Sequence, residues 1–220
     1  MQNEIMQKLS GKDDSRKHLT AGMNFSRNRN TWHLYASGYR NAANALVYGF
    51  EQGHIQQHLI NTTIYPIAFL YRHSIELWIK QMLFSCGKLL GESIDLQKSH
   101  ELDKLWSNLY STIKDRVYPY VNHEEGEEDK QLIKSVQNGI RQFTEIDRSS
   151  MAFRYPTDKK GMKFLTDLDY VHLGRLAEFC NEVLDNLEAM SMWLSNLIDE
   201  QSDWLSIETD LNEGADESLY

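Results

Sequence analysis

Apolar residues recur at intervals of three and four through most of this chain, and only three prolines interrupt the pattern. This spacing places apolar side chains along one face of an α-helix. No segment shows the strict alternation of apolar and polar residues that is typical of a strand. We therefore predict an all-α protein, an up-and-down helical bundle of about five helices. The helices are expected at about residues 32–50, 55–90, 100–113, 127–147 and 167–199.

Each proline follows a tyrosine, in the pairs Tyr65-Pro66, Tyr118-Pro119 and Tyr155-Pro156. Because the residue before a proline disfavours the α conformation, the last two pairs are predicted to mark breaks between helices. Pro66 is expected either to kink the second helix or to start its main part. Ser99 is expected to cap the third helix. Residues 148–164 are predicted to form a structured loop or a short hairpin.

The net charge of -9 is unevenly distributed along the chain. Residues 199–220 hold eight acidic residues and no Lys or Arg, and residues 123–129 hold five more acids. The remaining body is therefore mildly basic, and a basic groove remains open as a prediction. We expect three parts: a flexible N-terminal arm (1–31), the bundle (32–198) and an acidic C-terminal tail (199–220). The tail is expected to be mobile, or to dock only in an assembly.

The chain has no apolar run near the roughly 20 residues needed to cross a bilayer, and its first residues lack the apolar core of a secretory signal. We expect a cytoplasmic protein that does not contact membranes. Cys86 and Cys180 are the only cysteines and lie far apart in the sequence. They are predicted to be buried thiols and not a disulfide.

Charged residues cross the apolar pattern of the second predicted helix. Glu76 lies four residues after Arg72 and four before Lys80, so the three form one ridge. Charge is costly near a core unless it is paired, and this ridge therefore suggests a polar site between helices. A solvated row of salt bridges beside an ordinary core stripe is the alternative interpretation.

Five residues are the candidate catalytic residues: Arg72, His73, Glu76, His100 and Arg154. The first four converge if the second and third helices pack antiparallel. Arg72 would then bind an anion, while His73 or His100 would exchange protons near neutral pH. Arg154 would be a second guanidinium able to bind phosphate through two hydrogen bonds.

The same residues also fit a purely structural role. Arg154 would fasten its loop to an acid such as Asp147 or Glu76, and His100 would cap or pack at a helix terminus.

We expect neither a metal nor a cofactor. His54 and His58 have helical spacing, but no carboxylate lies between them as in a zinc protease helix. The chain has no Gly-rich phosphate loop and no nucleophile motif of the Gly-x-Ser-x-Gly type.

Four motifs occur in order along the chain: Trp32-x6-Tyr39-x2-Ala42-Ala43-x2-Leu46, Arg72-x3-Glu76-x3-Lys80-x2-Leu83, Ser99-His100-x-Leu102-x2-Leu105 and Phe153-Arg154-Tyr155-Pro156. In this order they resemble landmarks of the HEPN superfamily of helical bundles. That superfamily includes ribonucleases of toxin–antitoxin and phage-defence systems. Other members bind nucleotides or act as partners of nucleotidyltransferases. The resemblance spans nearly the whole predicted bundle.

In HEPN ribonucleases an Arg and a His, four to six residues apart, act together in a dimer cleft. This chain has two such spacings, Arg27-x5-His33 and Arg116-x6-His123. The first lies where the N-terminal arm enters the first helix. The second ends in the acidic run, which is a poor setting for attracting phosphate.

The resemblance implies an RNA-cleaving or nucleotide-handling component of a defence or toxin–antitoxin system. Its partners would be a second copy of the chain, RNA or a nucleotide, and an antitoxin or a nucleotidyltransferase. The alternative is a non-catalytic binding or assembly module. A homodimer is also predicted from four apolar residues that lie off the main stripe of the last helix: Leu173, Leu184, Trp193 and Ile198.

Overall fold

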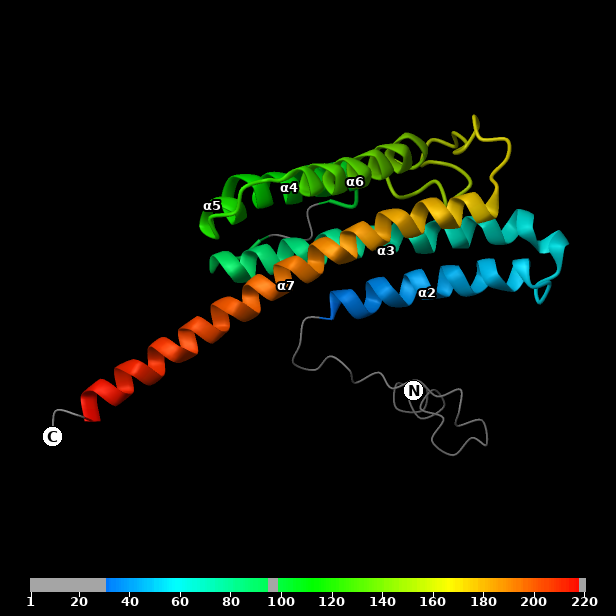
Figure 1. Cartoon of the computed structure of the whole chain (residues 1–220). Coiled ribbons are helices and arrows are strands. Elements are labelled where there is room, and N and C mark those ends of the chain that lie inside the picture. Colours follow the sequence, from blue (N-terminus) through cyan, green and yellow to red (C-terminus); the bar gives the residue numbers. More distant parts are fainter. Residues whose placement is uncertain (1–30, 95–98, 218–220) are drawn as a thin grey trace, which may run out of the picture. The chain divides into compact units, whose positions relative to one another are not determined.

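The computed structural model describes residues 31–94 and 99–217, and within them it contains helices and no strand (Figure 1). The elements are α2 (Trp32–Glu51), η2 (Gln57–Leu59), α3 (Ile60–Leu90), α4 (Leu102–Thr112), the π-helix η3 (Ile113–Val117), α5 (Tyr118–Tyr120), α6 (Glu127–Ile146) and α7 (Leu173–Glu217). The predicted all-α bundle of about five helices is confirmed, with α2, α3, α4, α6 and α7 as the long helices of the described part.

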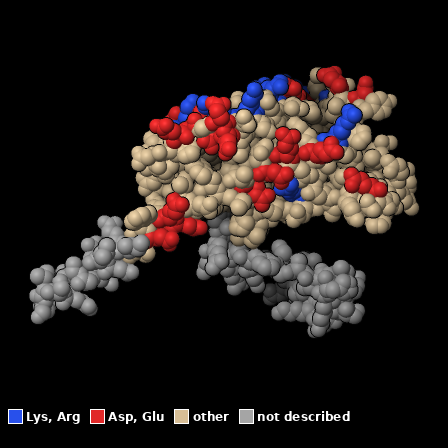
Figure 2. All heavy atoms as spheres, viewed as in Figure 1, with Lys and Arg blue, Asp and Glu red and all other residues tan. Residues whose placement is uncertain are grey.

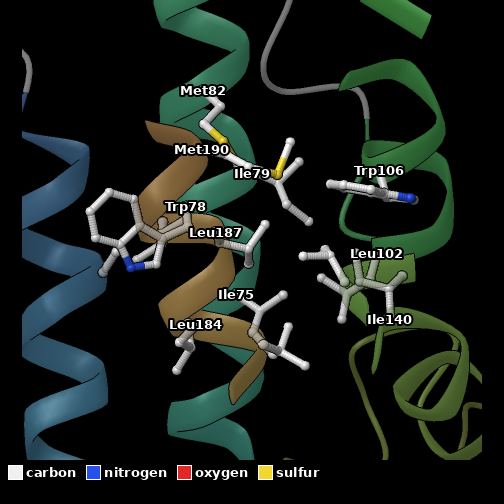
Figure 3. Close-up of a cluster of buried hydrophobic side chains, with 14 of the residues drawn as sticks. Ile75, Trp78, Ile79, Met82, Leu102, Trp106, Ile140, Leu184, Leu187 and Met190 are labelled. Atoms are coloured by element: carbon white, nitrogen blue, oxygen red, sulfur yellow. The ribbon is translucent and has the colours of Figure 1, made fainter. Parts of the chain in front are cut away.

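Helix α3 is the centre of the bundle, because it packs against α2, α4 and α7. Every residue from Ser74 to Leu83 is buried, so this part of α3 is covered all round and not along one stripe. Helix α6 closes the bundle against α4 and α7. Figure 3 shows the side chains that meet between these helices, among them Ile75, Ile79, Leu102, Ile140, Leu184 and Leu187.

Helix α3 runs without a break through Pro66, which lies inside its second turn. It ends at Gly91, whose φ of 69° is the left-handed conformation that favours glycine at a helix C-terminus. The third helix begins at Leu102 with Glu101 in the cap position and no side-chain cap. Ser99 therefore does not cap it as expected. Its Oγ instead accepts a hydrogen bond from the N–H of Glu101 at 3.0 Å.

The predicted break at Tyr118-Pro119 is wrong. The π-helix η3 carries the chain from α4 directly into α5, and Pro119 lies in the first turn of α5. The helical path stops after Tyr120, and Asn122 has a φ of 52°. The pair Tyr155-Pro156 does lie between helices. There a single antiparallel bridge joins Thr157 to Lys163, as expected for a structured loop or short hairpin.

Helix α7 begins later and ends later than predicted. It starts at Leu173, after a residue with positive φ at Leu165, and continues past Asp199 to Glu217. Gln201 fastens this extension, since its Nε2 donates to the carbonyl of Leu89 at 3.1 Å and to the Tyr120 hydroxyl at 2.7 Å. The C-terminal segment is thus helical over most of its length. The expected N-terminal arm, Thr31 apart, lies outside the described residues.

Three of the four residues used to predict a dimer are buried within this chain: Leu173, Leu184 and Ile198 belong to its core. Trp193 packs edge-on against Tyr118. Leu173, Leu184 and Ile198 need no partner surface, because α7 packs against α2, α3 and α6 of the same chain. The homodimer itself stays a prediction.

Cys86 and Cys180 are buried free thiols, as predicted. Burial raises the pKa of Cys86 to about 12. In the described residues no helix combines the length and the apolar character needed to cross a membrane. On the face seen in Figure 2, basic side chains lie among acidic ones and form no continuous basic surface.

Candidate functional site

The carboxylate of Glu76 is the centre of a buried ion cluster. Its side chain is 2% exposed. Oε1 accepts from Lys80 Nζ at 2.8 Å and lies 2.7 Å from His100 Nδ1, and Oε2 accepts from Arg72 Nη1 at 3.0 Å. Three of these groups come from consecutive turns of α3, because residues four apart share one face of a helix. The fourth, His100, comes from the segment that leads into α4.

Arg72 joins this cluster to two other parts of the fold. Its side chain is fully buried, and Nη2 donates to the backbone carbonyl of His100 at 2.6 Å. Nε lies 3.3 Å from Oδ2 of Asp147, the residue that follows α6, without hydrogen-bond geometry. The other oxygen of Asp147 accepts from the N–H groups of Met151 and Ala152 at 2.7 and 3.0 Å. Arg72 therefore holds α3, the start of α4 and the end of α6 together.

The buried charges balance one another. Arg72 and Lys80 are cations, and Glu76 and Asp147 are carboxylates, so the cluster is neutral with the histidines uncharged. Burial alone raises the pKa of Glu76, but the neighbouring His73, Lys80 and His100 lower it by more, and the pKa lies well below its ordinary value. Glu76 is therefore an ionised acceptor at neutral pH.

His100 links this buried carboxylate to solvent. An ionised carboxylate only accepts hydrogen bonds, so the contact requires Nδ1 of His100 to carry the proton. Nε2 of the neutral ring then has a free lone pair. The imidazole is 67% exposed, whereas Glu76 is 2% exposed. Because Arg72 binds the backbone carbonyl of the same residue, α3 fixes both the main chain and the ring of His100.

His73 lies at the edge of the cluster. Its Nδ1 is 3.9 Å from Oε2 of Glu76, and its side chain is 26% exposed. The ring stacks on Phe69 with centroids 5.5 Å apart and meets Tyr39 edge-on at 4.5 Å. These contacts hold the imidazole in place between α2 and α3.

Arg154 lies beside the cluster and not in it. Its Nε donates to the carbonyl of Ser150 at 2.7 Å, and Nη2 contacts the sulfur of Met151 at 3.2 Å. The guanidinium lies 5.6 Å from the ring centroid of Phe69 and 5.7 Å from that of Tyr155. It pairs with neither of the acids, Asp147 and Glu76, that the structural alternative proposed. Of the five candidate residues, the structure brings four together. Arg154 is separated from them by the ring of Phe69, which contacts both Arg154 and His73.

Arg72 occupies a different place from the one its predicted role requires. A guanidinium with no exposed surface does not meet a phosphate in solution, so Arg72 is a positioning residue for His100. The pairing of Arg72 with Asp147 was not predicted from the sequence. One sequence signal could have located Asp147. This residue directly follows the apolar stripe of a helix and precedes Ser149 and Ser150, a pattern typical of an aspartate whose side chain accepts hydrogen bonds from the backbone of the following turn.

The two Arg/His spacings place no such pair together in the described residues. Arg116 forms an ion pair with Glu92, and His123 lies 3.0 Å from Asp129. Arg27 lies outside the described residues. In the same part of the chain no three side chains of His, Cys, Asp or Glu are grouped so that they would hold a metal ion.

A groove of about 820 Å³ adjoins Arg154. One wall is the first turns of α3, from Ile60 to Tyr65, and the other is the irregular segment from Ala152 to Val171. Its lining is mainly aromatic and aliphatic. Volumes of this size are usual for sites that hold a small molecule.

Comparison of this chain with protein-family models, with curated proteins and with solved structures finds no match. The resemblance to the HEPN superfamily therefore stays a prediction, and any function must be argued from the geometry of the site.

Proposed function

We propose that this protein is a metal-independent RNA-cleaving enzyme in which His100 exchanges protons with the substrate. The contact of 2.7 Å between the buried Glu76 carboxylate and Nδ1 of the exposed His100 ring carries the proposal. A carboxylate that fixes the tautomer of an imidazole leaves the other ring nitrogen ready to act as a base. The same arrangement stabilises the imidazolium formed when that nitrogen takes a proton.

The reaction that suits this pair is attack of a ribose 2′-hydroxyl on the adjacent phosphorus. Nε2 of His100 removes the hydroxyl proton, the 2′ oxygen bonds to phosphorus, and the bond to the 5′ oxygen of the next nucleotide breaks. The products are a 2′,3′-cyclic phosphate and a 5′-hydroxyl, which receives a proton. Arg154, whose Nη1 has no protein partner in the described residues, is a cation available to bind another phosphate of the same strand.

The test is incubation of the purified protein with single-stranded RNA in the presence of a metal chelator. We expect cleavage products with cyclic phosphate ends, and loss of cleavage in His100→Ala. The matched control is His123→Ala, which removes a histidine that also contacts a carboxylate but lies outside the cluster. Equal activity in wild type and His100→Ala, with both folded, would contradict the proposal.

A second candidate function is a non-catalytic binding or assembly module, and the exposed face of α2 favours it. Leu34, Tyr35 and Tyr48 are 46%, 57% and 57% exposed, and α2 carries only two charged residues, Arg40 and Glu51. In this role the ion cluster only joins helices, and the partner is a second copy, an antitoxin or a nucleotidyltransferase. A folded protein that cleaves no RNA and forms a stable complex through α2 would favour this function.

A further inference from the structure

The groove beside Arg154 contains two cations, Arg154 and Lys163. Arg154 and Lys163 both line it, and in the part of the chain that the structure describes neither forms an ion pair. Asp169 is also in the lining, so the groove has a net positive charge with the acid among its residues. A cation held without a counter-ion is available to bind an anionic ligand.

The guanidinium of Arg154 is held in place before any ligand arrives. The carbonyl of Ser150 accepts from its Nε, and the rings of Phe69 and Tyr155 flank it. Nη1 donates to no atom of the described residues, and Arg154 as a residue is exposed. An arginine fixed in this way loses little freedom when it binds a phosphate, and this favours affinity.

Exposed aromatic rings line the same groove. Tyr65, Tyr155 and Tyr170 are 47%, 49% and 94% exposed. Exposed rings next to cations are the combination that binds single-stranded nucleic acids, because bases stack on the rings while phosphates contact the cations. A purely apolar ligand would leave both cations without an anionic partner.

We propose that this groove binds a nucleoside monophosphate unit, with the phosphate on Arg154 and Lys163 and the base on the exposed tyrosines. The unit is either a free nucleotide or one residue of an RNA strand. For the strand the inference rests on the proposed RNA cleavage. Phe69, below Arg154, lies seven residues before Glu76 on α3. At 1.5 Å per residue this is about 10 Å, or about three stacked nucleotides. The groove is then a subsite that sets a minimum substrate length.

Binding is tested by titration calorimetry with adenosine monophosphate, with inorganic phosphate and with a short oligoadenylate containing 2′-deoxyribose, which the proposed reaction cannot cleave. We expect both adenine ligands to bind more tightly than phosphate, and Arg154→Ala to weaken them by about tenfold or more. Arg148→Ala is the matched control, because it removes an exposed arginine of the same segment that does not line the groove. Tyr155→Ala should weaken the adenine ligands and leave phosphate binding unchanged.

Equal binding by wild type and Arg154→Ala would overturn the inference, as would equal losses in Arg154→Ala and Arg148→Ala, or no binding of any probe. Tighter binding of the oligonucleotide than of the mononucleotide identifies the strand as the ligand, and equal binding identifies the free nucleotide. Both results support nucleotide binding in the groove.

Failure of this inference can be told apart from failure of the proposed function. If the protein binds adenosine monophosphate through Arg154 but cleaves no RNA, the proposed cleavage is wrong and the binding site stands. If the protein cleaves RNA and the Arg154→Ala substitution changes neither cleavage nor binding, the cleavage stands and the binding site is wrong.

Discussion

Replacing Glu76 by Gln is the most direct way to measure how much the ion cluster contributes to the free energy of unfolding. The substitution keeps the shape of the side chain and removes its charge. Arg72, with no exposed side-chain surface, then retains Asp147 as its one acidic partner among the described residues, and Lys80, 7% exposed, loses its carboxylate partner. Removing one partner of a buried ion pair typically costs about 3–5 kcal/mol. We expect a loss of this size in the free energy of unfolding.

The chain contains its own control for this experiment. Arg141 and Glu145 on α6 have the same spacing as Arg72 and Glu76 and a contact of 2.9 Å, but their side chains are 64% and 61% exposed. Exposed pairs contribute about 0–1 kcal/mol, so Glu145→Gln should be nearly neutral. Burial is the variable that separates the two substitutions.

The assay is urea unfolding followed by circular dichroism, with thermal unfolding as a second readout. For a chain of this size, 3–5 kcal/mol corresponds to a fall in melting temperature of roughly 6–20 °C. A loss in Glu76→Gln that stays within about 1 kcal/mol of Glu145→Gln would refute the claim that burial makes this cluster energetically important.

The lowered pKa of Glu76 determines how the stability of the fold changes with pH. The pKa of Glu76 in the fold lies below its ordinary value of 4.5, so the unfolded chain binds that proton more readily. The stability that Glu76 contributes is present above about pH 4.5 and is lost as the pH falls below it. The difference in unfolding free energy between wild type and Glu76→Gln should therefore narrow as the pH falls below about 4.5. A difference that widens below this pH would contradict the assignment.

Three further predictions concern packing and the site. A Cβ on Gly139 would lie 2.2 Å from Val183, so Gly139→Ala should lower the free energy of unfolding by about 1–3 kcal/mol. Adding Val183→Ala to this variant should recover part of the loss. Gly38 has no neighbour within 4 Å of such a Cβ, so Gly38→Ala should stabilise α2 by about 0.5–1 kcal/mol. Similar effects of the two glycine substitutions in urea unfolding would disagree with the packing of α6 on α7. Gln201→Ala should cost about 1 kcal/mol by the same measurement, since it removes two hydrogen bonds from the α7 extension, and no loss would show that the extension is not fastened there. His100→Ala should abolish cleavage while lowering stability by about 1 kcal/mol, because Glu76 keeps Lys80 and Arg72; a protein that unfolds instead would indicate a structural histidine.

The ion cluster could be predicted from the sequence as far as it depends on helical geometry. Arg72, Glu76 and Lys80 share one face of any helix that contains them, whatever packs around it. The convergence of His100 needed one further assumption, that the second and third helices lie against each other. Both conditions hold in the structure, and the charged ridge of α3 takes part in a buried polar cluster, as its sequence pattern suggested.

The positions of Asp147 and Arg154 could not be predicted in the same way. Both lie in the irregular segment between α6 and α7, where the backbone follows turn geometry and tertiary contacts and has no repeating period. The continuous helical path from α4 through Pro119 could not be predicted for a related reason. A single π-helical turn of five residues is too short to show a hydrophobic period in the sequence, and here it leads the chain directly into α5, which contains the proline.

The most direct test of the central claim is the tautomer of His100, measured by long-range ¹H–¹⁵N nuclear magnetic resonance on protein with labelled histidines. The resonances are assigned by their absence in His100→Ala. If Glu76 holds the ring as described, neutral His100 carries its proton on Nδ1 and leaves Nε2 unprotonated at the surface. A neutral ring protonated on Nε2, or a mixture of tautomers like that of a free histidine, would contradict the account.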